Sequence, residues 1–268
     1  MTADTCWRVN TRETAMRYFI WLLIAVGLLQ AGALWAAPVA KAKAEEIICL
    51  RAADAIKIDG KFDEATWKNA KAMPMIIPVT GVVPISRASA KVAWDDRYLY
   101  VAFETADEDV WSTITQHDGK TCTEDAFEVF LSPLADKYGY ANLEINALGT
   151  VMDAMPLSIV GGGDDSHRWL NWTCRCIKVG ITIQGTLNNP ADKDTGWKME
   201  VAIPLTELLP ISERLPRAGD LWSVLLAHYD HSVYLPGGVE ASSIASLSVF
   251  SFHKSDEWRQ MRFVKETK

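Results

Sequence analysis

The tryptophans that fall in polar, loop-like stretches are the residues of this sequence best suited to recognition chemistry. Aromatic side chains offer flat apolar faces and neighbouring planar polar groups offer hydrogen bonds, so together they can hold a small polar ligand. Trp169 and Trp172 close the stretch 161–172, which begins with three glycines and also carries His167 and Arg168. This pattern predicts a recognition loop, and the alternative is a surface loop whose tryptophans anchor it to the core. Two further tryptophans lie in similar polar stretches: Trp111 and Trp258.

Two carboxylates close together in the sequence could be interpreted as a catalytic pair, but their spacing argues against that role. Asp125 and Glu128 lie three positions apart in a strand-like run, so their side chains fall on opposite faces. We expect Asp125 to end the preceding loop and Glu128 to pair with a basic group across the sheet. The sequence therefore predicts no catalytic residues.

The metal-ligating residue types do not form a complete set of ligands. Asp192–Gly196 resembles the start of a calcium loop, but Ile203 stands where the closing glutamate belongs, so a turn is expected. His228 and His231 flank Asp230 without a third ligand in view, and Cys174-x-Cys176 has no second pair at a useful spacing. We therefore expect no metal site and no cofactor, with a structural calcium ion as an alternative that no clear motif supports.

The five cysteines are Cys6, Cys49, Cys122, Cys174 and Cys176. Cys174 and Cys176 lie two apart in an expected strand, so their side chains share a face and do not readily meet the torsion of a disulfide. The sequence predicts at most one disulfide, and none between these two residues.

The N-terminus has the order of a secretory signal. Arg17 precedes the apolar run Phe19–Leu29, and small residues follow up to Ala37. We expect a leader over 1–37 that starts at Met1 or Met16, a linker over 38–46, and a secreted or periplasmic domain over 47–268. The alternative is an uncleaved helix over 19–37 that anchors the protein to a membrane. A membrane is a partner only in that case.

Charge and motifs exclude other classes of function. The net charge is −7 and no basic stripe is present, so no nucleic-acid partner is expected. No Gly-x-Ser-x-Gly, phosphate loop or dinucleotide fingerprint occurs.

The elements that must position these residues are short strands separated by turns. Runs at 91–94 and 98–103 flank the tight loop Asp95–Arg97 and predict a hairpin. Further strands are expected at 56–59, 126–131, 141–146, 150–155, 174–179, 181–187, 197–203, 221–229 and 261–264. Short helices are expected at 63–70, with Asp63 as cap, and at 205–209. The fold class is all-β, an antiparallel β-sandwich with one or two short helices and a core that includes Trp94, Trp197 and Trp222.

Several segments in order resemble the family 9 carbohydrate-binding modules and related carbohydrate-binding family 9-like domains, a fold class of carbohydrate-binding and DOMON-like sandwiches. The segments are Ile58–Trp67, Val92–Phe103, Glu124–Leu131, Gly196–Pro204, Gly219–Trp222 and Phe252–Phe263. The resemblance implies a β-sandwich that binds carbohydrate or polysaccharide, often beside a glycoside hydrolase, and we expect any such hydrolase to be a separate protein.

The resemblance also implies a clamp of two tryptophans around a terminal sugar, and this sequence departs from it. Cys122 and Phe252 stand at the clamp positions, and Glu144 replaces an arginine ahead of Asn146. We expect sugar on a surface shared by Phe252, His253, Trp111 and the stretch His167–Trp172. The alternative is that Phe252 is a core residue that closes the sandwich.

The leading hypothesis is a secreted, non-catalytic carbohydrate-binding protein that is accessory to polysaccharide degradation. The alternatives are a scaffold domain without a small ligand, a glycan-active enzyme of unrecognised type, and a haem- or redox-binding sandwich. The last would use ligands from Met152, Met155, His167, His228 and His231.

Overall fold

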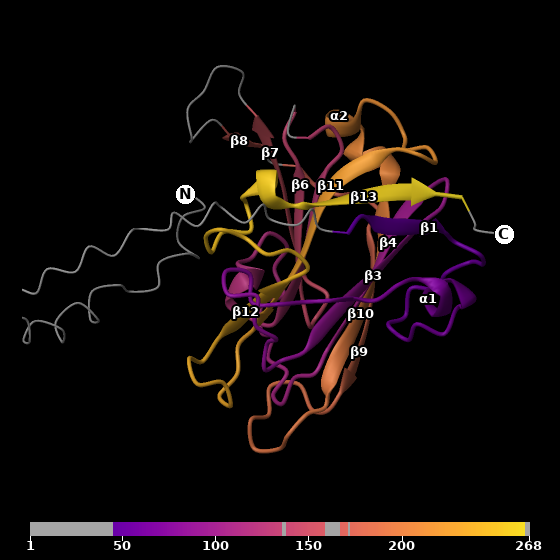
Figure 1. Ribbon diagram of the computed structural model, residues 1–268. Coiled ribbons are helices and arrows are strands. Elements are labelled where there is room, and N and C mark those ends of the chain that lie inside the picture. The colour runs from indigo at the N-terminus through magenta and orange to yellow at the C-terminus, as the bar shows by residue number, and fades with distance from the viewer. Residues whose placement is uncertain (1–44, 136–137, 159–166, 171, 266–268) are drawn as a thin grey trace, which may run out of the picture. The chain divides into compact units, whose positions relative to one another are not determined.

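The computed structural model describes residues 45–135, 138–158, 167–170 and 172–265, which form strands joined by turns (Figure 1). The strands are β1 (Ile47–Arg51), β2 (Met73–Pro74), β3 (Ala88–Trp94), β4 (Tyr98–Thr105), β5 (Ala126–Ser132), β6 (Ala141–Asn146), β7 (Val151–Ser158), β8 (His167–Leu170), β9 (Lys178–Gln184), β10 (Gly196–Pro204), β11 (Leu221–Asp230), β12 (Glu240–Ser243) and β13 (Arg259–Val264). The helical pieces are α1 (Ala65–Asn69), α2 (Leu209–Ser212) and the 3-10 turns η2 (Thr121–Thr123), η3 (Leu205–Leu208) and η4 (Ser255–Glu257).

The leader expected over 1–37 lies outside the described residues, as does the linker up to residue 44. Within the described ranges, no helix has the length and apolar character needed to span a membrane.

The hairpin of β3 and β4 forms where the sequence predicts it. The two strands pair antiparallel from Ala88 opposite Thr105 to Trp94 opposite Leu99. Asp95 closes the loop, because its side chain accepts the backbone N–H groups of Arg97 and Tyr98 at 2.7 and 2.8 Å. An aspartate that binds the backbone two and three residues onward is a standard means of fixing a tight turn.

The strands follow one another in a single curled path. Their order is β8-β7-β6-β5-β11-β13-β1-β3-β4-β10-β9, with β12 beside β11 and β2 beside β3. The pairs are antiparallel except that β1 runs parallel to both β13 and β3. The first and last described strands are therefore neighbours in the middle of the path.

Ring contacts show that the curled sheet closes on itself as a sandwich. Phe103 of β4 stacks on Phe127 of β5 with centroids 4.5 Å apart, and Trp197 of β10 lies 4.5 Å from the same ring. β5 is not a sheet neighbour of β4 or β10, so these rings meet across two facing layers. Trp94, Trp197 and Trp222 are buried in the core, as predicted. The predicted all-β sandwich is confirmed.

A second, smaller cluster covers the outer side of β3, β4 and β10. Trp67 of α1 is fully buried there, and its indole N–H donates to Glu200 at 2.7 Å. The other oxygen of Glu200 accepts the N–H groups of Asp59 and Gly60 at 2.9 and 2.7 Å. The strand expected at 56–59 is therefore wrong: this segment is a turn held by a buried carboxylate.

Two more local expectations are wrong. A single strand, β9, replaces the two expected at 174–179 and 181–187, and Cys176 adopts a left-handed conformation with φ 59° just before it. The residue before α1 is Glu64 and not Asp63, and it makes no side-chain capping bond.

The cysteine predictions are tested as far as the described residues reach. Cys49, Cys174 and Cys176 are free, which confirms that the last two are not bonded to each other. Cys122 is disulfide-bonded.

Candidate functional site

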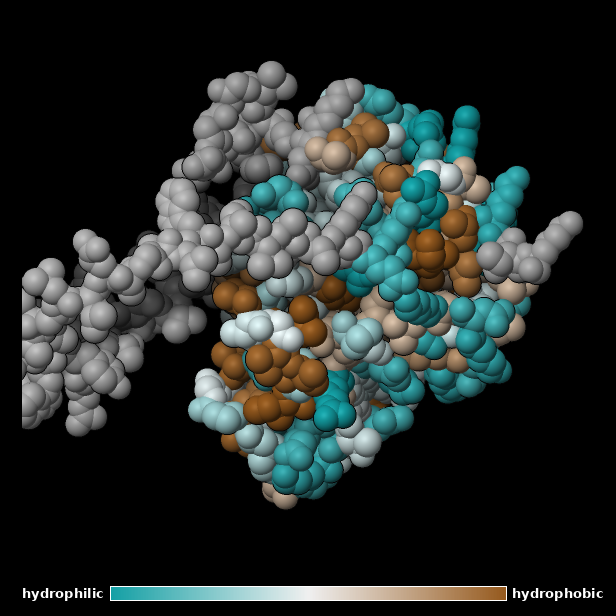
Figure 2. Space-filling model, viewed as in Figure 1, coloured by the Kyte–Doolittle hydropathy of each residue, from teal (hydrophilic) through white to brown (hydrophobic). Residues whose placement is uncertain are grey.

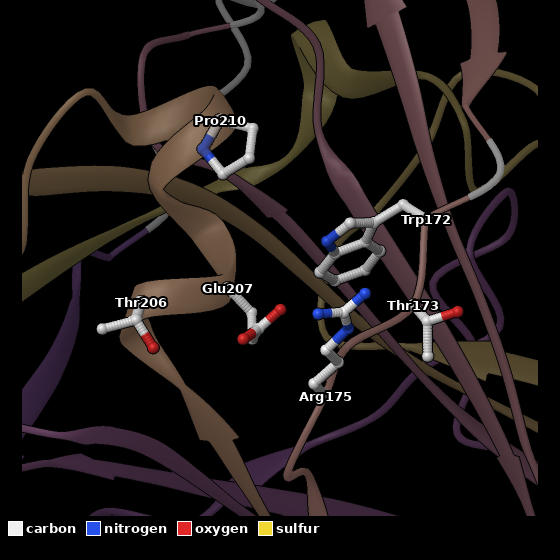
Figure 3. Close-up of a pocket in the computed structure, with 6 residues that line it drawn as sticks. All are labelled: Trp172, Thr173, Arg175, Thr206, Glu207 and Pro210. Atoms are coloured by element: carbon white, nitrogen blue, oxygen red, sulfur yellow. The ribbon is translucent and has the colours of Figure 1, made fainter.

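A surface pocket of about 350 Å³ lies beside Trp172. One wall is the segment between β8 and β9, and the other is the turn η3 with the start of α2 (Figure 3). Figure 3 shows the indole of Trp172, the guanidinium of Arg175 and the carboxylate of Glu207 directed toward the space between the two walls. The remaining lining residues are Thr173, Thr206 and Pro210.

The charged side chains of this pocket remain available to a ligand. Within the described part of the chain, neither Arg175 nor Glu207 has an ion-pair or hydrogen-bond partner, although both line the same pocket. The guanidinium offers donors, the carboxylate offers acceptors, and the indole offers a flat apolar face. These are the three kinds of group that a sugar ring requires.

The wall that carries Trp172 is anchored to the sandwich at Cys174. The backbone N–H of Cys174 donates to Asp153 Oδ2 on β7 at 3.0 Å, and the thiol of Cys174 is buried. Burial raises the pKa of the Cys174 thiol, so it stays protonated and acts as a packing group. Trp172 and Arg175 thus project from a segment held at its centre.

The predicted recognition stretch is divided in the structure. His167, Arg168 and Trp169 belong to β8, which pairs with β7 so that Trp169 lies opposite Pro156. The side chains of these three residues lie outside the described part, and their role in binding stays a prediction. Trp172 follows β8 and lines the pocket.

Trp111 lies elsewhere and is not part of the pocket lining. It is 40% exposed, and its backbone N–H donates to Asp125 Oδ2 at 2.5 Å. The pocket is therefore lined by Trp172 and not by Trp111, although the sequence predicts a surface shared by both residues.

Phe252 is a core residue in this structure. Its ring is fully buried and packs against Phe130 and Tyr229, and its carbonyl accepts the indole N–H of Trp258 at 2.7 Å. His253 is half-buried, with Nδ1 2.7 Å from the hydroxyl oxygen of Tyr140. Because the Phe252 ring is fully buried, neither of its faces is open for a sugar to stack on.

Two buried glutamates face each other on neighbouring strands. Glu128 on β5 lies directly opposite Glu144 on β6, and both are buried. Burial raises the pKa of both groups, and the charge of Glu144 raises the pKa of Glu128 further. The basic partner expected for Glu128 is therefore wrong, because its neighbour across the sheet is an acid.

The haem hypothesis finds no support in the placement of its ligands. Met152 and Met155 are three positions apart on β7, so they face opposite sides of the strand. The ring of His228 lies in the core, 4.6 Å from Phe127.

A cluster of three buried aspartates has the donor set of a calcium site. Asp107, Asp125 and Asp230 come from the ends of β4, β5 and β11, and one oxygen from each lies within 4.8 Å of the others. Asp107 Oδ2 and both oxygens of Asp230 are buried and find no hydrogen-bond partner in the described ranges. Burial raises the pKa of all three carboxyls, and the charges of neighbouring carboxylates raise the pKa of each further. Oxygen donors that lack partners fit a hard cation such as Ca²⁺.

An apolar surface lies away from the pocket. Its exposed side chains come from the loop between β2 and β3 and from the segment after β12: Val79, Val82, Val83, Ile85, Val249 and Phe250. Figure 2 shows hydrophobic atoms gathered over the region where Figure 1 draws β12. These side chains have no hydrogen-bonding groups, so the surface does not suit a sugar.

Similar solved structures share the fold at low sequence identity. A family 9 carbohydrate-binding module from Caldicellulosiruptor kristjanssonii in complex with cellotriose is 15% identical with a TM-score of 0.58, covering 84% of this chain and 96% of that one. A putative carbohydrate-binding protein from Bacteroides uniformis is 12% identical with a TM-score of 0.62, covering 82% and 99%. The glucose complex of a Caldicellulosiruptor kristjanssonii family 9 module is 14% identical with a TM-score of 0.54, covering 82% and 97%.

No curated protein matches this chain. A family model does, the one described as carbohydrate family 9 binding domain-like, over residues 58–233. That range holds the sandwich from the turn before α1 to the end of β11. The chain therefore belongs to the carbohydrate family 9 binding domain-like family.

Proposed function

We propose that this protein is an exported, non-catalytic carbohydrate-binding module that holds a glycan in the pocket beside Trp172. The observation that carries the proposal is the pocket itself, in which an indole, a guanidinium and a carboxylate face one open space. The family and the bound sugars of its solved members support the same ligand class.

The charge of the pocket favours a neutral glycan. One cation and one anion line it, so their charges balance. A sugar carboxylate would gain from Arg175 but be repelled by Glu207, whereas neighbouring hydroxyls can accept from the first and donate to the second. Stacking on one ring contributes on the order of 1 kcal/mol beyond buried area, so we expect affinities near the millimolar range, roughly −4 kcal/mol.

The placement of carboxylates supports binding without hydrolysis. Glycoside hydrolysis uses two carboxyl groups on either side of the scissile bond, about 5–9.5 Å apart. Glu207 is the one acidic residue among those that line the pocket. Glu128 and Glu144 are buried, so neither carboxylate lies on an open surface that a glycosidic bond could approach.

The test is a glycan array followed by titration calorimetry with the glycan that binds. Trp172→Ala should weaken binding at least tenfold, about 1.4 kcal/mol, because it removes the stacking face. Trp111→Ala is the matched control, since it deletes another accessible indole outside the pocket. Loss of binding in Trp111→Ala with full affinity in Trp172→Ala would show that the site lies elsewhere.

Export rests on the charged, apolar and small-residue order of residues 17–37. We expect mature protein to begin between Leu34 and Glu45. N-terminal sequencing of secreted or periplasmic material checks this. Full-length protein recovered from the membrane fraction would favour the anchor instead.

A further inference from the structure

The loop between β4 and β5 places two potential metal ligands against β7. The backbone N–H of Asp118 donates to the carbonyl of Val151 at 3.0 Å, so the tip of this loop is docked on the strand. Asp118 adopts a left-handed conformation with φ 61°, which turns the chain there. His117 and Asp118 consequently lie beside Asp153 of β7.

The donor atoms of these three residues have the spacing of ligands around one ion. His117 Nε2 lies 3.5 Å from Asp118 Oδ1 and 3.7 Å from Asp153 Oδ1, and one donor from each residue lies within 4.8 Å of the others. Zinc bonds of about 2.0–2.2 Å in a tetrahedral site separate adjacent donors by roughly 3.4 Å. An ion between these atoms needs only small side-chain movements.

Asp153 supplies an independent indication of a ligand. The residue is 6% exposed, and its Oδ2 accepts the N–H of Cys174 at 3.0 Å. Its Oδ1 is buried, points toward His117 Nε2, and has no hydrogen-bond partner in the described part of the chain. A buried carboxylate oxygen left without a partner is costly, and a cation removes that cost.

We propose that His117, Asp118 and Asp153 form a site for a divalent transition-metal ion of the Zn²⁺ class. The imidazole nitrogen selects this class over Ca²⁺ and Mg²⁺, which take oxygen ligands. Three protein ligands leave at least one coordination position for water. The site is separate from the aspartate cluster of Asp107, Asp125 and Asp230, whose donors are all oxygen.

The site also touches the wall of the glycan pocket through one residue. Asp153 coordinates the ion through Oδ1 and holds Cys174 through Oδ2, and Cys174 lies between Thr173 and Arg175 of the pocket. The ion would therefore fix the carboxylate that anchors this wall. The metal site stands whether or not the pocket binds a glycan, because its test measures the metal.

The experiment is titration calorimetry of chelator-stripped protein with ZnCl₂ and, separately, with CaCl₂. We expect one Zn²⁺ bound with micromolar affinity at this site. His117→Ala should weaken Zn²⁺ binding at least roughly tenfold while the protein stays folded, because this side chain is 47% exposed. Asp153→Asn should weaken it as well, and Co²⁺ in place of Zn²⁺ should give visible absorption bands that His117→Ala removes.

Two controls separate the site from adventitious binding. Gln116→Ala changes an exposed neighbour that donates no ligand, and Cys176→Ser removes an exposed free thiol. Both should bind Zn²⁺ as the unaltered protein does. The proposal is overturned if the unaltered protein binds no Zn²⁺ at submillimolar concentration, if His117→Ala binds it equally well, or if Cys176→Ser alone abolishes binding.

Discussion

The aromatic side chains of this protein differ in burial, and the sequence predicts only some of these differences. Trp94, Trp197 and Trp222 are flanked by apolar strand residues, so their burial could be predicted locally. Phe252 gives no such signal, because its cover comes from Phe130 and Tyr229 on distant strands. The open pocket at Trp172 likewise depends on Glu207, which local patterning does not connect to it.

A substitution at Phe252 separates the core role from a binding role. Phe252→Ala should lower the free energy of unfolding by about 3–5 kcal/mol, because it removes a fully buried ring. Urea denaturation measures this, and Phe250→Ala, at a ring that is 45% exposed, is the control with a much smaller effect. Phe252→Ala protein that is as stable as the unaltered protein but has lost its glycan would restore Phe252 to the binding site.

At the scale of elements, hairpins could be predicted and tertiary turns could not. The β3–β4 hairpin is fixed by alternating residues and by Asp95, all within a few positions of one another. The sequence before β9 is equally typical of a strand. There, however, the N–H of Cys174 donates to Asp153, and Cys176 adopts a positive φ that turns the chain. The contact that decides this conformation is made by a residue 21 positions away.

The turn at Asp59 and Gly60 allows a test of a contact between segments that are distant in the sequence. Gly60 has φ +77°, and a Cβ there would lie 2.8 Å from the backbone of Ile181 and Thr182 on β9. Gly81 has a similar φ of +70° with nothing within 4 Å, so it is a matched control for backbone strain alone. Gly60→Ala should cost about 1–3 kcal/mol more than Gly81→Ala in urea denaturation. Equal costs would mean that β9 does not pack tightly on this turn.

At the scale of the whole molecule, the order of the strands assembles groups that the sequence keeps apart. The ends of β4, β5 and β11 bring together Asp107, Asp125 and Asp230. Short strands and turns predict the all-β class, but they do not specify that β11 lies beside β5 or that β1 lies between β13 and β3. The aspartate cluster therefore could not be found from spacing.

This cluster gives stability a defined dependence on pH. Burial and repulsion raise the pKa of the three carboxyls above their ordinary value of about 4. At a pH below that ordinary pKa, the three carboxyls are protonated in both the folded and the unfolded chain. As the pH rises, the unfolded chain releases these protons first, so the free energy of unfolding falls until the folded pKa values are passed. Glu128 and Glu144 contribute with the same sign.

Bound Ca²⁺ favours the ionised carboxylates of the three clustered aspartates. It should therefore offset the part of the fall in the free energy of unfolding that these aspartates cause. In chelator the melting temperature should fall between pH 5 and pH 8. At pH 8, Ca²⁺ at about a hundredfold excess over its Kd should add about 2.7 kcal/mol, which raises the melting temperature by roughly 5–10 °C, with a smaller rise at pH 5. Asp230→Asn should melt higher than the unaltered protein in chelator at pH 8, because it removes one repelling charge, and it should lose most of the response to Ca²⁺. Scanning fluorimetry over this pH range decides the matter: an unchanged melting temperature on adding Ca²⁺ at pH 8, or a full response in Asp230→Asn, would show that the three aspartates do not hold the ion.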